Sequence, residues 1–150
     1  MATNVVSVLN DLVETSKDGE QGFRKAAEEA HDAQLKSLFL QAAEECTRGA
    51  RELQDVVQGL GGKPETGGSV AGALHRGWVD VKTAVTSRTD YDILADCEKG
   101  EDVAKKHYRE ALEKDLPVDV RMVVDRQFQG VVQNHDRIRD LRDQYAATRR

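Results

Sequence analysis

Apolar side chains recur every three or four residues along most of this chain, which is the spacing of one face of an α-helix. The pattern predicts four long helices, from about Asn4 to Ala30, from Ala33 to Leu60, from Thr89 to Asp115, and from Pro117 to near the last residue. No run of alternating apolar and polar residues indicates a strand. The sequence therefore predicts an all-α protein.

Residues that cap helices mark the expected boundaries. His31-Asp32 forms a short turn between the first two helices, and Gly61-Gly62 followed by Pro64 is typical of a left-handed C-terminal cap. Thr89-Asp90-Tyr91-Asp92 is similar to a capping box and opens the third helix. These signals separate two helical hairpins.

The connection between the second and third helices is long, about 28 residues, and can run the length of the bundle. Hairpin, crossover and hairpin is the order of a ferritin-like antiparallel four-helix bundle, here a single domain over residues 1–150. Apolar residues within the connection recur at helical spacing and predict a short extra helix that Trp78 packs onto the bundle. These residues are Val70, Leu74, Trp78, Val81 and Val85.

Composition excludes several classes of partner. The net charge of −5 and the isoelectric point near 5.4 give no electrostatic reason to bind nucleic acid or an anionic membrane surface. No signal peptide or stretch of about 18 apolar residues appears, so we expect a cytoplasmic protein. Cys46 and Cys97 lie far apart without zinc-type spacing, and we expect them to be reduced thiols.

Two glutamates occupy positions where a helix should be apolar. Glu20 and Glu101 each fall on the apolar stripe of their helix. A buried carboxylate costs several kcal/mol, on the order of half the stability of a domain, unless it is protonated, paired with a cation or bound to a metal. The sequence therefore predicts a polar site inside the bundle.

Further residues are expected at the same height in the bundle. At a rise of about 1.5 Å per residue, Glu45 is nearly level with Glu20, while Glu98 and His135 are level with each other about one turn from Glu101. These five side chains are the candidate ligands for one divalent ion, since carboxylate and imidazole suit Mn, Fe or Zn.

Four short motifs carry a resemblance to known proteins. They are Asp18-Gly19-Glu20-Gln21-Gly22-Phe23, His75-Arg76-Gly77-Trp78, Cys97-Glu98-Lys99-Gly100-Glu101 and His135-Asp136. With them the chain resembles an uncharacterised bacterial family of ferritin-like bundles, and more distantly the ferritin and rubrerythrin superfamily. The superfamily's di-iron site takes one Glu from each of two helices and Glu-x-x-His from the other two. The resemblance implies that Glu20 and Glu101 are the single glutamates and that Glu45 belongs to the first Glu-x-x-His.

The chain departs from the superfamily pattern at two ligand positions. Arg48 stands where the first histidine is expected, and Val132 stands where the second Glu-x-x-His needs its glutamate. Because a guanidinium cannot bind a metal but pairs well with carboxylates, Arg48 is the expected counter-ion of the buried acids.

Two hypotheses follow for function. One is a non-catalytic bundle without a cofactor, with a Glu/Arg/His network in place of di-iron, acting through its surface, as a homodimer or with an unknown partner, in bacterial stress physiology. The other is a divergent protein that binds Fe, Mn or Zn through carboxylates. Neither hypothesis names a reaction or a substrate.

Overall fold

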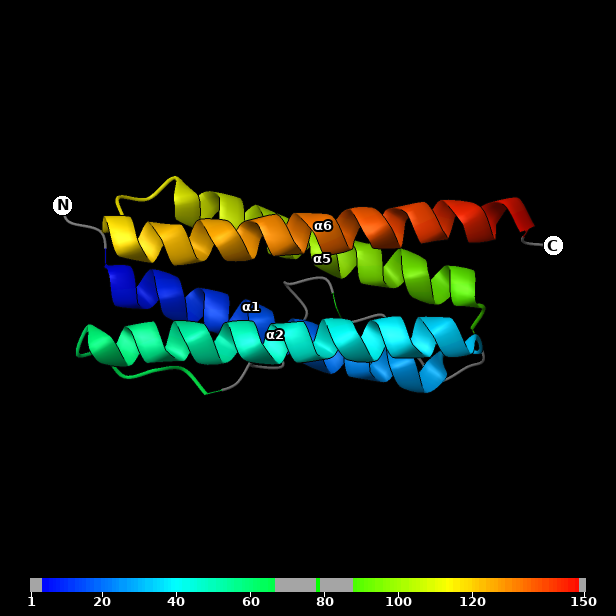
Figure 1. The fold of residues 1–150 in the computed structure, drawn as a ribbon, viewed down its shortest axis with the longest axis horizontal. Coiled ribbons are helices and arrows are strands. Elements are labelled where there is room, and N and C mark those ends of the chain that lie inside the picture. The colour runs from blue at the N-terminus through cyan, green and yellow to red at the C-terminus, as the bar shows by residue number, and fades with distance from the viewer. Residues whose placement is uncertain (1–3, 67–77, 79–87, 149–150) are drawn as a thin grey trace.

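The computed structural model describes residues 4–66, 78 and 88–148, and all of its regular structure is helical. Figure 1 shows the elements as a bundle of long helices. The elements are α1 (Val5–Glu29), α2 (Ala33–Gly59), α5 (Asp90–Leu112) and α6 (Val118–Thr148). The described residues contain no strand, so the predicted four-helix, all-α architecture is confirmed.

The helix ends follow the predicted capping signals. The Asp32 side chain accepts hydrogen bonds from two backbone N–H groups at the start of α2. Thr89 and Asp92 form the predicted capping box of α5. Gly61, with φ of 81°, adopts the left-handed conformation expected after α2.

Each short turn makes an antiparallel hairpin, α1 with α2 and α5 with α6 (Figure 1). The chain after α2 lies beside the start of α1, where Asn10 bonds to the backbone of Lys63 and Glu65. The start of α5 lies at the opposite end, where the Asp90 carboxylate accepts from the backbone N–H groups of His31 and Asp32 at 2.8 and 3.1 Å. The connection between α2 and α5 therefore begins at one end of the bundle and finishes at the other. The extra helix predicted within it falls mostly on residues 67–77 and 79–87, outside the described residues, but Trp78, the one described residue of that stretch, is not helical.

Trp78 is buried against α1 and α5, as the sequence predicts. Its indole is 2% exposed and lies edge-on to Phe23, with ring centroids 5.0 Å apart. A Cβ atom at Gly22 of α1 or Gly100 of α5 would lie within 3.0 Å of the indole carbons. Glycine at both positions therefore lets the indole approach the two helices closely.

The core forms two clusters, one toward each end of the bundle. One cluster includes Phe23, Phe39, Trp78, Ile93 and Ile138. The other includes Leu9, Leu53, Val57, Tyr108 and Val124. Polar and small residues occupy the stretch between the clusters, and the candidate sites lie there. No described helix combines the length and apolar composition that a bilayer span requires.

Candidate metal centre

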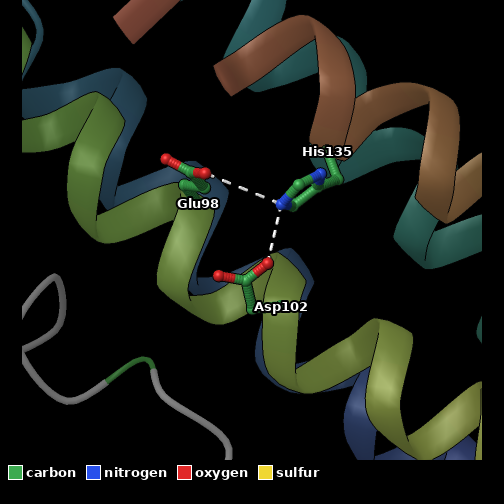
Figure 2. Close-up of side chains that lie close together, drawn as sticks. All are labelled: Glu98, Asp102 and His135. Carbon is green, nitrogen blue, oxygen red and sulfur yellow. Dashed lines mark ion pairs between the residues drawn. The ribbon is translucent and has the colours of Figure 1, made fainter.

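Three side chains that could bind a metal meet between α5 and α6. Glu98 and Asp102 lie one turn apart on α5, and His135 faces them from α6 (Figure 2). His135 Nε2 lies 2.7 Å from Asp102 Oδ1 and 3.7 Å from a Glu98 oxygen. One donor atom from each residue lies within 4.8 Å of the other two, which is close enough for all three to contact one ion.

His135 Nε2 is buried without a hydrogen-bond partner. The residue is only 6% exposed, and Figure 2 shows this nitrogen facing the gap between the two carboxylates. Although Asp102 is close, the direction of the contact does not satisfy a hydrogen bond. An unsatisfied buried polar atom costs about 1–3 kcal/mol, so this nitrogen calls for a ligand.

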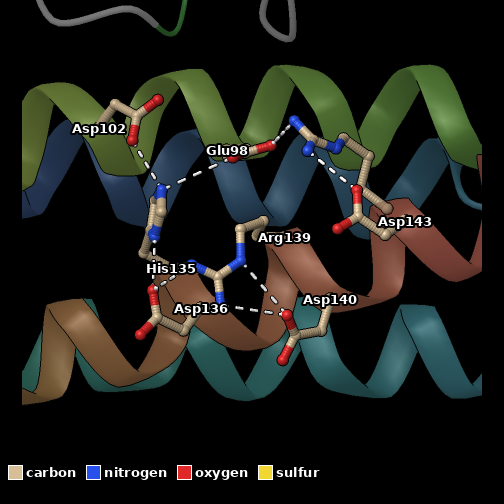
Figure 3. A network of polar contacts seen from close by, with 8 residues as sticks. Glu98, Asp102, His135, Asp136, Arg139, Asp140 and Asp143 are labelled. Atoms are coloured by element: carbon tan, nitrogen blue, oxygen red, sulfur yellow. Dashed lines mark hydrogen bonds and ion pairs between the residues drawn. The ribbon is translucent and has the colours of Figure 1, made fainter.

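The other imidazole nitrogen is held by a neighbouring carboxylate. His135 Nδ1 lies 2.9 Å from Asp136 Oδ1, and this hydrogen bond, helped by the charge of Arg139, lowers the pKa of Asp136 (Figure 3). An ionised carboxylate only accepts hydrogen bonds, so Nδ1 is the donor. In the neutral imidazole, Nε2 then presents its lone pair to Glu98 and Asp102. Histidines that bind metals are commonly oriented by such a carboxylate.

Glu98 divides its two oxygens between two partners. Oε1 pairs with the Arg142 guanidinium, and Oε2 is the oxygen that faces His135. Arg142 also donates to Asp143 at 3.0 Å, so the cluster belongs to a network of ion pairs along α6 (Figure 3). The oxygen that faces His135 remains available to an ion.

Arg48 does not have the counter-ion role that the sequence suggested. Its side chain is exposed on α2 and makes no hydrogen bond or ion pair in the described part of the chain. The arginine on Glu98 is Arg142, which comes from α6. The resemblance does not point to Arg142, because this residue lies outside the ligand positions of the superfamily.

The five predicted ligands do not gather in one cluster. Glu98 and His135 lie together, whereas Glu20 accepts a hydrogen bond from Thr47 Oγ1 at 2.6 Å. Glu45 is exposed, and it lines a cavity together with Glu101. The structure therefore separates a cluster between α5 and α6 from a carboxyl group in the interior.

Glu101 is the interior carboxyl group, and it is 4% exposed. Burial raises its pKa to about 8 and the nearby charge of Glu45 acts in the same direction, whereas a 2.8 Å hydrogen bond from Asn134 Nδ2 and the charge of Lys105 oppose the rise. The carboxyl group therefore keeps its proton at neutral pH. Of the three alternatives for a buried acid, protonation is the one that describes Glu101.

Asp102 was missed because it does not lie on the apolar stripe of its helix. Its side chain is 58% exposed, so the apolar periodicity of the helix does not single it out as a buried acid. Its spacing of four residues from Glu98 could have identified it, because residues i and i+4 share one face of a helix.

Most of the chain matches a known protein family. Residues 4–114 match the family described as a domain of unknown function, DUF2383. The chain belongs to this family. The matched residues include Glu98 and Asp102 but end before α6, so His135 lies outside the matched range. No curated protein matches the chain.

Proposed function

We propose that this DUF2383 protein binds a single divalent transition-metal ion through Glu98, Asp102 and His135. The observation that carries the proposal is His135 Nε2, which is buried, lacks a hydrogen-bond partner and faces two carboxylates. A cation at this point would contact the lone pair and both acids at once.

The ligand set favours Mn, Fe or Zn. An imidazole with two carboxylates suits these ions better than Ca or Mg, which prefer oxygen ligands alone. Three protein ligands leave further coordination positions for water. The exposed side of Asp102 gives an ion a direct route from solvent.

This site would be a divergent form of the superfamily's centre. The ferritin-like relationship is part of the same proposal. Its support is the order of the helices and the burial of Trp78. The ligands would come from two neighbouring helices rather than from four.

The second candidate is a non-catalytic bundle in which the same cluster is held together by ion pairs alone. Its support is Arg142, which already pairs with Glu98. In this case the protein would act through its surface, as a homodimer or with a protein partner, and the stress-related role expected from the sequence would belong here.

Metal content separates the two candidates. We expect protein purified without chelator, or titrated calorimetrically with Mn²⁺ and Zn²⁺, to bind one ion per chain. Asp102→Asn should abolish binding because it removes one ligand. Asp136→Asn should weaken binding about 10- to 100-fold, since Asp136 only orients the histidine.

The matched control is Asp125→Asn, which removes an exposed acid from α6 outside the cluster. It should bind metal like the wild type. A wild-type protein that binds neither ion would contradict the proposal and favour the ion-pair network, and so would an Asp102→Asn protein with unchanged affinity.

A further inference from the structure

A cavity of about 460 Å³ lies between the two core clusters, on the side where α2 faces α6. All four described helices and Trp78 contribute to its wall. Small residues on α2, α5 and α6 leave the space open, namely Ala42, Gly49, Ala104 and Gly130. Cavities of this size commonly hold small ligands in proteins, and an unfilled one costs stability.

The cavity is long and runs parallel to the helices. Its wall extends from Ala42 to Glu52 on α2, which at about 1.5 Å per residue spans roughly 15 Å. On α6 it extends from Arg126 to Asn134, roughly 12 Å. A volume of about 460 Å³ spread over this length suits an elongated molecule better than a compact one.

The charged side chains around the opening balance one another. Glu45, Arg48 and Arg126 are exposed, so the cavity opens to solvent between α2 and α6. Arg126 pairs with Glu52 across the two helices, and Glu45 and Arg48 lie one turn apart on α2. The opening therefore has no excess of either charge that would select a cation or an anion.

Most polar groups in the wall satisfy one another. The Tyr108 hydroxyl donates to Gln127 Oε1 at 2.7 Å, and Gln127 Nε2 donates to Glu52 Oε1 at 2.7 Å. These groups stabilise the wall and have little capacity left for a ligand.

Glu101 offers a hydrogen-bonding position in the interior. It is 4% exposed, and Asn134 donates to Oε1 at 2.8 Å, while Oε2 has no partner in the described part of the chain. Lys105 and Glu45 act on this carboxyl group with charges of opposite sign. A hydroxyl group donates a hydrogen bond to a carboxylate and accepts one from a carboxylic acid. An alcohol therefore fits Oε2 whether or not Glu101 carries its proton.

We propose that the cavity binds a small uncharged alcohol with an elongated apolar body. The hydroxyl would bind Glu101 Oε2, and the body would lie along the small residues of α2 and α6 and against the Trp78 indole. A charged head group would lose its hydration on entering, and the balanced charges at the opening give neither sign an advantage. This site is independent of the proposed metal centre, although Glu101 and Asp102 are neighbours in the sequence.

Three probes with the same unbranched chain and different charge test the proposal. They are octan-1-ol, n-octylammonium and octanoate, each used below the concentration at which it forms micelles. Binding can be followed by calorimetry and by the fluorescence of Trp78, the single tryptophan of the chain, which lines the cavity. We expect saturable binding of octan-1-ol and binding of the two charged probes at least about tenfold weaker (1.4 kcal/mol).

Two substitutions at Glu101 test its contact with the hydroxyl. Glu101→Gln keeps an uncharged group that donates and accepts hydrogen bonds, so its affinity for octan-1-ol should stay close to that of the wild type. Glu101→Met has a similar length but no comparable hydrogen-bonding group, so it should bind the alcohol about tenfold more weakly. Both variants should keep the helical circular dichroism of the wild type and its binding of Mn²⁺.

A leucine in the wall tests where the apolar body lies. Ala104→Leu fills part of the cavity and should weaken the binding of octan-1-ol at least about tenfold without affecting Mn²⁺. The matched control is Ala146→Leu, which adds the same side chain at an exposed position of α6 outside the cavity and should bind the alcohol like the wild type.

Three outcomes would overturn the inference. Binding of either charged probe as tightly as octan-1-ol would show that the cavity does not select an uncharged head group. Unchanged affinity for octan-1-ol in either Glu101→Met or Ala104→Leu would place the alcohol elsewhere. Absence of octan-1-ol binding by wild-type protein that still binds metal would exclude the alcohol site and leave the metal proposal intact.

Discussion

Glycines inside the helices have opposite consequences on two sides of the bundle. Between α1 and α5, Gly22 and Gly100 lie directly against Trp78, and the indole closes the space between the helices. Between α2 and α6, which make few contacts, a Cβ atom at Gly130 would lie more than 4 Å from every described residue of the other elements. Both sides carry the same signal in the sequence, a glycine inside a helix. What differs is whether a third element fills the space.

This difference explains where the cavity lies. Trp78 fills the space beside α1 and α5, and nothing equivalent fills the space beside α2 and α6 in the described part of the chain. Polar residues are tolerated on the open side because they bond to one another, as Tyr108 and Gln127 do. One side of the bundle is therefore closed by packing, and the other leaves a cavity.

Alanine substitutions test the contrast most directly. Gly100→Ala should destabilise the protein by about 3 kcal/mol, because the rigid indole must move away from the new methyl group. Gly130→Ala should stabilise it by about 0.5–1 kcal/mol, because helical alanine is preferred and the space is open. Urea midpoints at equal slope measure both effects. Equal destabilisation by the two substitutions would contradict the contrast.

The pH dependence of the free energy of unfolding tests whether the buried carboxyl group of Glu101 is protonated in the folded protein. The pKa of Glu101 is about 8 in the folded protein, above its value of 4.5 in an exposed side chain, so the folded state binds the proton more tightly. Stability should therefore fall as pH rises between these values, by about 2 kcal/mol from pH 6 to pH 8, and at most about 1.4 kcal/mol per unit.

Glu101→Gln is the control, because it cannot ionise. Its urea midpoint should change less with pH than that of the wild type, and above pH 8 it should be the more stable protein. The measurement is a series of urea titrations at several pH values without added metal. A wild-type curve parallel to that of Glu101→Gln would mean that Glu101 is ionised without penalty.

The fold could be predicted from the sequence because its signals are local. Helix caps such as Asp32 and Gly61 act within a few residues, and the apolar periodicity defines the buried face of each helix. The burial of Trp78 also followed from its position on an apolar stripe. These features depend little on how the helices rotate against one another.

The candidate site was harder to predict because it depends on that rotation. Heights along the helices were enough to bring Glu98 and His135 together, but they could not show which face Glu45 or Arg48 presents. The cation that pairs with Glu98 was also unpredictable from family positions, since Arg142 lies seven residues, or two turns, beyond His135 on α6. Side-chain partners across helices need the angular register that a single sequence does not contain.

Arg48→Ala is the smallest expected effect and the sharpest test of the counter-ion idea. A counter-ion of buried acids would cost about 3–5 kcal/mol when removed. Because Arg48 is exposed and makes no ion pair in the described structure, we expect a change within about 0.5 kcal/mol of the wild type. Arg142→Ala is the matched comparison, since its side chain, 32% exposed, pairs with Glu98 and should cost more, about 1 kcal/mol. A urea midpoint that falls further for Arg48→Ala than for Arg142→Ala would show that Arg48 does neutralise the interior carboxylates in solution.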